Sequence, residues 1–152
     1  MVTFAPAVLP ALDVVRGVRG LLGLSNYTVK VVTKAWSGAR PGIGVVTVTT
    51  TQLLVGLGQN PRVTVISSND VVASAGKYSA GDLRVGPMTP AYAGGGVADG
   101  VINPTIGIVE QVTWLVEGPG TAIGGDQYDR IADEMPGSPL ERFVVLRKTG
   151  ST

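Results

Sequence analysis

Short runs rich in Val, Ile and Thr recur along the chain and predict a mainly β protein. Clusters of Gly, Pro, Ser and Asn separate these runs, as turns separate the strands of an antiparallel sheet. The expected strands are residues 27–36, 45–51, 62–67, 83–85, 106–116 and 141–148. Residues 128–135 are ambiguous between a strand and one or two helical turns.

The final expected strand is apolar on both faces. Phe143 and Val145 alternate with Val144 and Leu146, so neither face is polar. A strand of this kind is buried on both sides or lies at a subunit contact.

The period changes near the N-terminus, where residues 6–24 predict one α-helix. Apolar residues recur there at steps of three and four, namely Val8, Leu12, Val15, Val18 and Leu22. Asp13, Arg16 and Arg19 interrupt the apolar run, which argues against a transmembrane span. No basic residue precedes the run, as one would in a signal peptide. We expect the helix to pack on the body or on a neighbour, with Arg16 and Arg19 on its solvent side.

A glycine-rich stretch, residues 76–104, divides the chain. Gly86-Pro87 and Thr89-Pro90 are expected to stop the short strand before them, because proline has no N–H for a sheet ladder. The rest of the stretch is flexible in composition but keeps Tyr92, Val97, Val101 and Ile102. We interpret residues 86–105 as an extended contact loop that orders on another chain. The alternative is an idle surface loop.

Together these patterns predict one domain over residues 1–152. The expected fold is a small β-barrel built from residues 27–85 and 106–148, with one N-terminal α-helix and a long glycine-rich loop.

Composition and charge favour a protein that covers part of its surface with partners. Hydrophobic residues make up 44% of the 152 residues and charged residues only 15%. Residues 1–84 hold eight basic and three acidic residues, a charge of +5, whereas residues 85–152 hold four basic and eight acidic ones, a charge of −4. Such a split favours head-to-tail contact between like subunits, unless the charges are merely scattered over two faces.

The sequence predicts no catalytic residue, cofactor or metal site. It contains no Cys and no His, which excludes disulfides, thiol nucleophiles, histidine bases and the usual zinc sites. The acidic cluster consists of Asp126, Asp129, Asp133 and Glu134. It lacks the spacing of a calcium-binding loop, so we interpret it as a solvated edge. The glycines at 56–58 and 118–125 lack the pattern of a phosphate loop.

Several segments nevertheless resemble one family. They are the SGARPGIG turn at 37–44, DLRVGPMTP at 82–90 before a long loop, WLVEG at 114–118 and FVVLR at 143–147. Their order is similar to that in the head-completion proteins of tailed bacteriophages, also called head-closure, neck or head–tail connector proteins. The likeness covers most of residues 26–148.

The resemblance implies a structural virion protein without enzymatic activity. Copies form a homo-oligomeric ring in the neck, between the portal or adaptor protein and the tail terminator or tail proteins. DNA passes through the channel without sequence-specific binding, no membrane is involved, and assembly occurs in the host cytoplasm. The implied contact residues are Asp82 and Arg84 at the base of the loop, Met88, Tyr92, Val97, Val101 and Ile102 along it, and Arg16 and Arg19 on the helix.

Two other functions are compatible with the sequence. One is a tail-terminator, tail-tube or decoration protein on a similar β-body. The other is a small ligand-binding module or enzyme that uses residues 118–134 as a pocket, with Asp126 or Asp129 as ligands.

Overall fold

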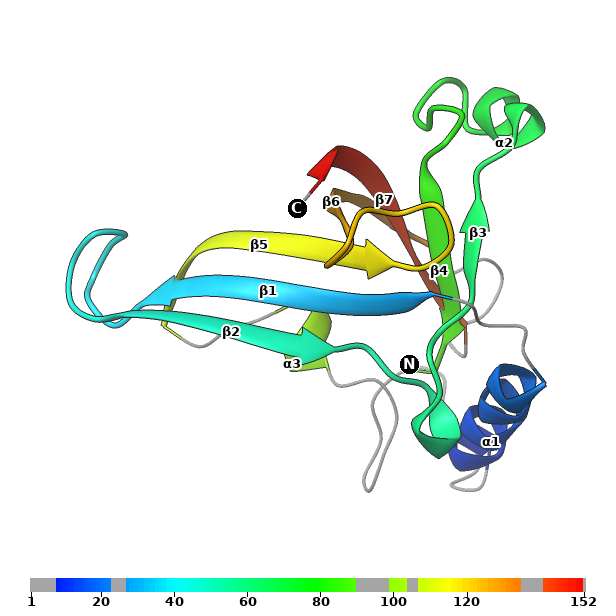
Figure 1. The fold of residues 1–152 in the computed structure, drawn as a ribbon, viewed down its shortest axis with the longest axis horizontal. Helices are drawn as coiled ribbons and strands as arrows, with labels where there is room; N and C mark the ends of the chain where they lie inside the picture. The colour runs from blue at the N-terminus through cyan, green and yellow to red at the C-terminus, as the bar shows by residue number, and fades with distance from the viewer. Residues whose placement is uncertain (1–7, 23–26, 90–98, 104–106, 135–140, 152) are drawn as a thin grey trace.

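The strands form one open, strongly twisted sheet (Figure 1). The computed structural model describes residues 8–22, 27–89, 99–103, 107–134 and 141–151. The strands are β1 (Thr28–Trp36), β2 (Val46–Gln52), β3 (Val63–Val65), β4 (Leu83–Met88), β5 (Ile108–Glu117), β6 (Asp126–Glu134) and β7 (Arg142–Ser151). All seven are antiparallel to their neighbours, in the order β2-β1-β5-β6-β7-β4-β3. The mainly β fold is therefore confirmed, but the sheet is not a closed barrel, because β2 and β3 stand at its two ends.

The helical elements are short apart from the first. They are α1 (Val8–Leu21), the 3-10 turn η1 (Gly56–Gly58), α2 (Ser68–Ala73) and α3 (Asp99–Ile102). The expected N-terminal helix is confirmed as α1, whereas α2 was not predicted. Its start is set by a capping box, in which Ser67 and Asp70 bond reciprocally to each other's backbone N–H. This Ser-x-x-Asp pattern was the local signal in the sequence.

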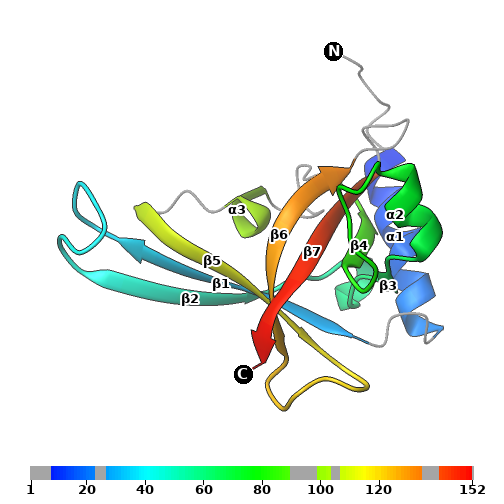
Figure 2. The same cartoon turned by 90° about the horizontal axis from the view of Figure 1, so that it is seen from above.

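The sheet forks between β5 and β6. Strand β5 pairs with β1 over nearly its whole length, but with β6 only from Trp114 to Val116. Beyond this point β6 follows β7 instead. Figure 2 shows β2, β1 and β5, which we call the wing, diverging from β6, β7, β4 and β3. Residues 108–113 of β5 therefore have no strand on the fork side among the residues that the structure describes.

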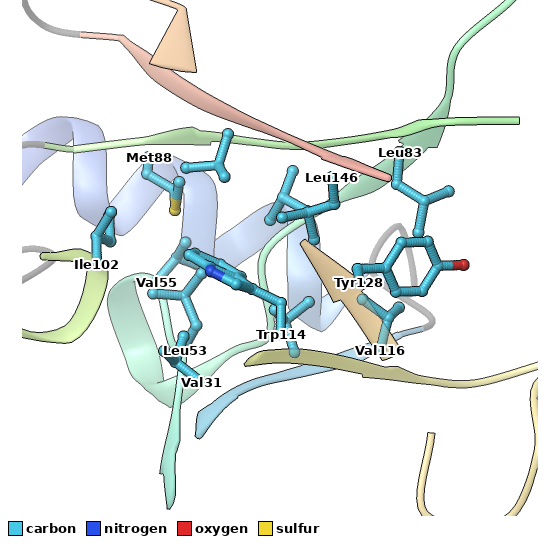
Figure 3. Close-up of a cluster of buried hydrophobic side chains, with 13 residues drawn as sticks. Val31, Leu53, Val55, Leu83, Met88, Ile102, Trp114, Val116, Tyr128 and Leu146 are labelled. Carbon is cyan, nitrogen blue, oxygen red and sulfur yellow. The ribbon is translucent and has the colours of Figure 1, made fainter. Parts of the chain in front are cut away.

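The main core lies where the wing meets the other strands. Trp114 of β5 is 1% exposed, and it is surrounded by apolar side chains from β1, β4, β7, α3 and the segment after β2 (Figure 3). The cluster includes Val31, Leu53, Met88, Ile102 and Leu146. Burial of such side chains stabilises the fold by about 1.5–3 kcal/mol each.

The last strand is buried on both faces, as its apolar pattern predicted. Val144 and Leu146 point into the main core, and Val145 points the opposite way. Val145 packs there with Ile66 and Tyr78, near α2. Val144, Val145 and Leu146 are all fully buried. The first of the two expected explanations, burial on both sides, therefore accounts for the pattern.

Strand β4 continues through Gly86-Pro87, where the sequence predicted that it would stop. The pairing with β7 shifts register between Val85 and Met88, so the strand passes Pro87 at an irregular position. There the missing N–H of proline interrupts no regular ladder. Gly86 has a φ of 140°, and its N–H donates to the carbonyl of Arg62 at 2.9 Å. The strand resumes at Met88, opposite Arg142.

Candidate functional site

Most of the predicted contact loop that the structure describes belongs to the body. Met88 is completely buried on β4, and Ile102 on α3 is 2% exposed in the main core. Val101 is half-buried against the same core. The prediction that Met88 and Ile102 lie on a contact arm is therefore wrong for this chain, because their side chains fill its interior. Tyr92 and Val97 lie outside the described residues.

Asp82 lies at the start of β4, where it holds β7 and the preceding turn together. Its carboxylate accepts from Arg147 Nη2 at 2.9 Å and Nε at 3.2 Å, and from the Ser79 backbone N–H at 2.8 Å. Burial alone would raise the pKa of Asp82, but the bonds from Arg147 and Ser79 lower it below its usual value. Asp82 is 4% exposed, so its partners lie within the chain.

Arg84 is engaged in a similar way. Its Nε donates to Glu134 Oε1 at 2.8 Å, and its Nη1 lies 3.6 Å from Asp70 Oδ1. The bond to Glu134 is the main reason that the pKa of Arg84 is raised. Arg84 therefore connects β4, β6 and α2. Its contacts in the structure are those of an ion pair that stabilises the fold.

Arg16 lies on the inner side of α1 and Arg19 on the outer side. Arg16 is 7% exposed and donates to Thr89 Oγ1 at the end of β4. Burial lowers the pKa of Arg16, while Glu141 and Asp13 act in the opposite direction. The expectation of two solvent-facing arginines is thus correct for Arg19 and wrong for Arg16. The reason is that Arg16 has a hydrogen-bonding partner on the body that the sequence does not reveal.

The orientation of α1 leaves apolar side chains in solvent. Asp13 and Arg16 face the body, and the helix lies against η1. The outward residues, which we call the α1 face, are Val14, Val15, Val18, Leu21 and Leu22, and they are 42–71% exposed. An amphipathic helix normally shows solvent its polar side. On α1 this arrangement is reversed, and the apolar residues form the exposed side.

The β1–β2 hairpin projects from the body of the molecule (Figures 1 and 2). Its turn lies at the opposite end of the long axis from α1. Beside the turn, Ile43, Val45, Val46 and Val48 are 42–71% exposed. Every residue of β2 but one is exposed, so the strand has neither face in the core.

The outer edge of β2 also presents its backbone to solvent. Bonds from Leu53 N–H to the Val29 carbonyl (2.8 Å) and from Ser37 N–H to the Val45 carbonyl (3.0 Å) flank a ladder of constant register. In an antiparallel ladder every second residue exchanges backbone hydrogen bonds with the partner strand. The two bonds above show that in β2 these are the odd-numbered residues, which bond to β1. The N–H and C=O groups of Val46, Val48 and Thr50 therefore point away from the sheet.

The hairpin is a positively charged arm. Residues 28–52 contain Lys30, Lys34 and Arg40 and no acidic residue. Lys34 is paired with Glu110 of β5 at 3.0 Å, and the Trp36 indole N–H donates to the same carboxylate at 2.8 Å. These bonds lower the pKa of Glu110, with Trp36 contributing most. Arg40, in the turn, is exposed and has no ion pair with another described residue.

The fork between β5 and β6 contains a cavity of about 480 Å³. It is lined by Ile102, Asn103, Val109, Val112, Trp114, Asp129 and Arg130. Arg130 donates to the Ile102 carbonyl at 2.9 Å and to Asn103 Oδ1 at 2.7 Å, which fixes α3 at this position. Asp129 is exposed and forms no ion pair with another described residue.

The predicted acidic cluster is thus divided by the fold. Asp126 is 5% exposed and pairs with Lys148 at 3.2 Å. Asp133 pairs with Arg142 at 2.7 Å, and Glu134 with Arg84. Asp129 is the exception, since it is exposed and is one of the residues that line the fork cavity. Among the described residues, no three acidic, His or Cys side chains are placed to hold a metal ion.

The sequence did not reveal the hairpin or the fork as candidate surfaces. The signal for the hairpin was present, since residues 46–52 are uncharged and lack proline although they form an edge. The fork left no such signal, because it depends on where β6 leaves β5. Within the described part of the chain, no helix has the length and apolar character needed to cross a membrane.

Comparison with known proteins assigns no family. Neither a protein-family model nor a curated protein matches this chain. Among solved structures, the chain is similar to the solution structure of protein SF1141 from Shigella flexneri 2a, a structural genomics target. The two are 12% identical, the TM-score is 0.42, and the match covers 82% of this chain and 92% of that chain. A likeness of this size carries no argument about function.

Proposed function

We propose that this chain is a structural subunit that assembles with copies of itself into a ring at the head–tail junction of a tailed bacteriophage. DNA passes through the channel of the ring without sequence-specific contact. The portal or adaptor lies on one side of the ring and the tail proteins on the other. The family resemblance of residues 26–148 supports the location in the virion, and the subunit has no enzymatic role.

The observation that carries the proposal is the presence of two apolar surfaces at opposite ends of the molecule. One is the hairpin, where Val45 is 71% exposed, and the other is the α1 face, where Leu22 is 71% exposed. Soluble monomers rarely keep such patches uncovered. Because the two surfaces differ in structure, each copy can offer one surface to one neighbour and the other surface to a second. Contacts of this head-to-tail kind generate a ring when they close.

The oligomeric state tests the proposal directly. We expect light scattering or native mass spectrometry to give a mass many times 15.6 kDa, alone or with virion partners. Negative-stain images of the same sample should show rings. A strict monomer, even in the presence of the portal and tail proteins, would count decisively against a ring subunit.

Other virion roles on this fold make a different prediction about position. A tail terminator, tail-tube or decoration protein would also assemble through exposed apolar surfaces. Cryo-electron microscopy of the particle distinguishes them, because the proposed neck ring must lie between the portal and the tail. Density along the tube or on the capsid would replace the neck assignment.

A second candidate, binding of a small polar ligand, is favoured by one observation. The fork cavity is lined by the exposed acidic residue Asp129 together with the apolar Val109, Val112 and Trp114 of β5. If this is the function, a bound ligand should raise the melting temperature of the wild type but not that of Asp129→Ala. Whatever the starting melting temperature of Asp126→Ala, the ligand should raise it by the same amount as in the wild type. If chelators and both substitutions leave binding and ligand-induced stabilisation unchanged, this candidate fails.

A further inference from the structure

We propose that the β1–β2 hairpin of one copy adds its β2 edge to the open edge of β5 in the fork of the next copy. The inference rests on the proposed function, since it names the contact between neighbouring subunits. It assigns a donor surface, the hairpin, and an acceptor surface, the fork, to the same chain.

The donor is an unprotected strand edge. Natural proteins shield exposed edges with charged residues, proline or bulges, because the free backbone groups otherwise recruit another strand. Strand β2 has the sequence VTVTTTQ, with neither charge nor proline. Its outward backbone groups at Val46, Val48 and Thr50 are regularly spaced for strand addition.

The acceptor is the part of β5 that is not paired with β6. Residues 108–113 of β5 are paired with β1 on one side only. Val109 and Val112 line the cavity next to this edge, and the buried Trp114 lies at its inner end. An added strand would therefore meet both free backbone groups and apolar walls.

Charge complements shape at this contact. Arg40 lies in the turn of the donor hairpin, and Asp129 lies in the acceptor fork. Neither residue forms an ion pair with another described residue. The other acidic residues of β6 along the fork, Asp133 and Glu134, are ion-paired with arginines of their own chain. The negative charge that can attract the hairpin is therefore that of Asp129. Opposite charges of this kind favour the correct partner and accelerate its encounter.

We assign the donor strand to a second copy, because a chain cannot fill its own fork in this way. Strand β1 lies between β2 and β5, and neighbouring strands are about 4.8 Å apart, so the β2 edge stays about 9.5 Å or more from β5 of the same chain. The donor and acceptor surfaces are also different. Their association is therefore head-to-tail, as a ring requires.

Engineered cysteines test the contact without background, because the chain contains no cysteine. Val48→Cys is combined in turn with Val109→Cys, Gln111→Cys and Val112→Cys in the full chain. A disulfide within one chain is excluded, since bridged Cα atoms lie within about 7 Å of each other. We expect a reducible ladder of covalent multimers on mild oxidation for at least one of the three pairs.

The matched control uses Val72→Cys, on a side chain of α2 that is 80% exposed and far from β2 in sequence. Combined with the same three fork cysteines, it should give no ladder above that of the single-cysteine variants. A ladder of equal strength would mean that random collision explains the cross-links, and it would overturn the proposal.

Two sets of substitutions give a second readout. Val48→Pro removes an N–H that β1 does not use, so the subunit should stay folded while association weakens about tenfold or more, whereas Val48→Thr should change little. Arg40→Glu and Asp129→Arg should each weaken association about two- to fivefold, and the double variant should recover. Arg62→Glu, an exposed site outside both surfaces, is the control.

The outcomes separate this inference from the proposed function. Rings that form without any hairpin–fork cross-link, and that tolerate Val48→Pro, would overturn the contact and leave the ring subunit intact. A wild-type chain that stays monomeric at every concentration, alone and with virion partners, would overturn both.

Discussion

Gly17 of α1 and Gly56 of η1 meet backbone against backbone. A Cβ on Gly17 would overlap the carbonyl of Gly56, and a Cβ on Gly56 would overlap the carbonyl of Asp13. The helix can therefore lie on η1 only because both positions lack a side chain. Gly17 weakens the helix by about 1 kcal/mol relative to Ala, and the close approach explains why it is there.

We predict that Gly17→Ala and Gly56→Ala lower the stability of the chain. The overlap should cost about 1–3 kcal/mol and outweigh the gain in helix propensity at Gly17. Thermal denaturation followed by circular dichroism measures the effect. Gly150→Ala is the control, because a Cβ there meets only Gln127 Oε1 at an ordinary 3.7 Å. A higher melting temperature for Gly17→Ala would contradict the packing of α1 on η1.

The ion pair of Asp82 with Arg147 should make stability depend on acid. The folded-state pKa of Asp82 is lowered, so its contribution is fully present above the unfolded value of about 3.9 and is lost as the pH falls through the lower, folded-state pKa. In Arg147→Met the buried carboxylate loses its main partner, and burial then raises its pKa. We expect the midpoint of acid unfolding to move to higher pH and the stability at neutral pH to fall, because a buried carboxylate without its partner is costly.

Urea unfolding at several pH values between 2 and 7 measures this change. Arg62→Met removes an exposed arginine just before β3 and should keep the wild-type acid profile. If Arg147→Met has the same profile as the wild type, Arg147 does not lower the pKa of Asp82.

Ile102 distinguishes a core role from a contact role. Because its side chain is 2% exposed beside Trp114 and Met88, Ile102→Ala should destabilise the isolated chain by about 2–5 kcal/mol. Val72→Ala, at an 80% exposed position, should change stability by less than about 0.5 kcal/mol. Equal melting temperatures for the two variants would restore the original interpretation of Ile102 as a contact residue. Deletion of residues 92–103 is not a clean test of assembly, because it removes this core side chain.

The α1 face should affect assembly and not folding. Val14→Ser and Leu21→Ser alter side chains that are 50% and 63% exposed, so unfolding should change by less than about 0.5 kcal/mol for each. If a neighbour covers this face, the double variant should have a lower mass by light scattering at equal concentration. Arg19→Ser, on an exposed polar site of the same helix, controls for general effects of the surface. An unchanged mass would remove α1 from the ring contacts.

The sequence by itself determined the class of the fold and most of its elements. Alternation and turn residues predicted the strands, and the two apolar faces of β7 predicted its burial, because local period reflects which face of an element meets the core. It left open residues 128–135, which β6 occupies as a strand up to Glu134, since four charges there hide the alternation.

Only the tertiary structure decided which segment projects and which is buried. The glycine-rich composition around residues 86–105 indicated an arm, yet Met88 and Ile102 fill the core, and the regular β1–β2 hairpin extends into solvent instead. Arg16 turns inward because Thr89, 73 residues away, accepts its hydrogen bond. The fork exists because β6 leaves β5 after three pairs of residues and follows β7. Each of these outcomes depends on partners that are distant in sequence, and local composition contains no information about them.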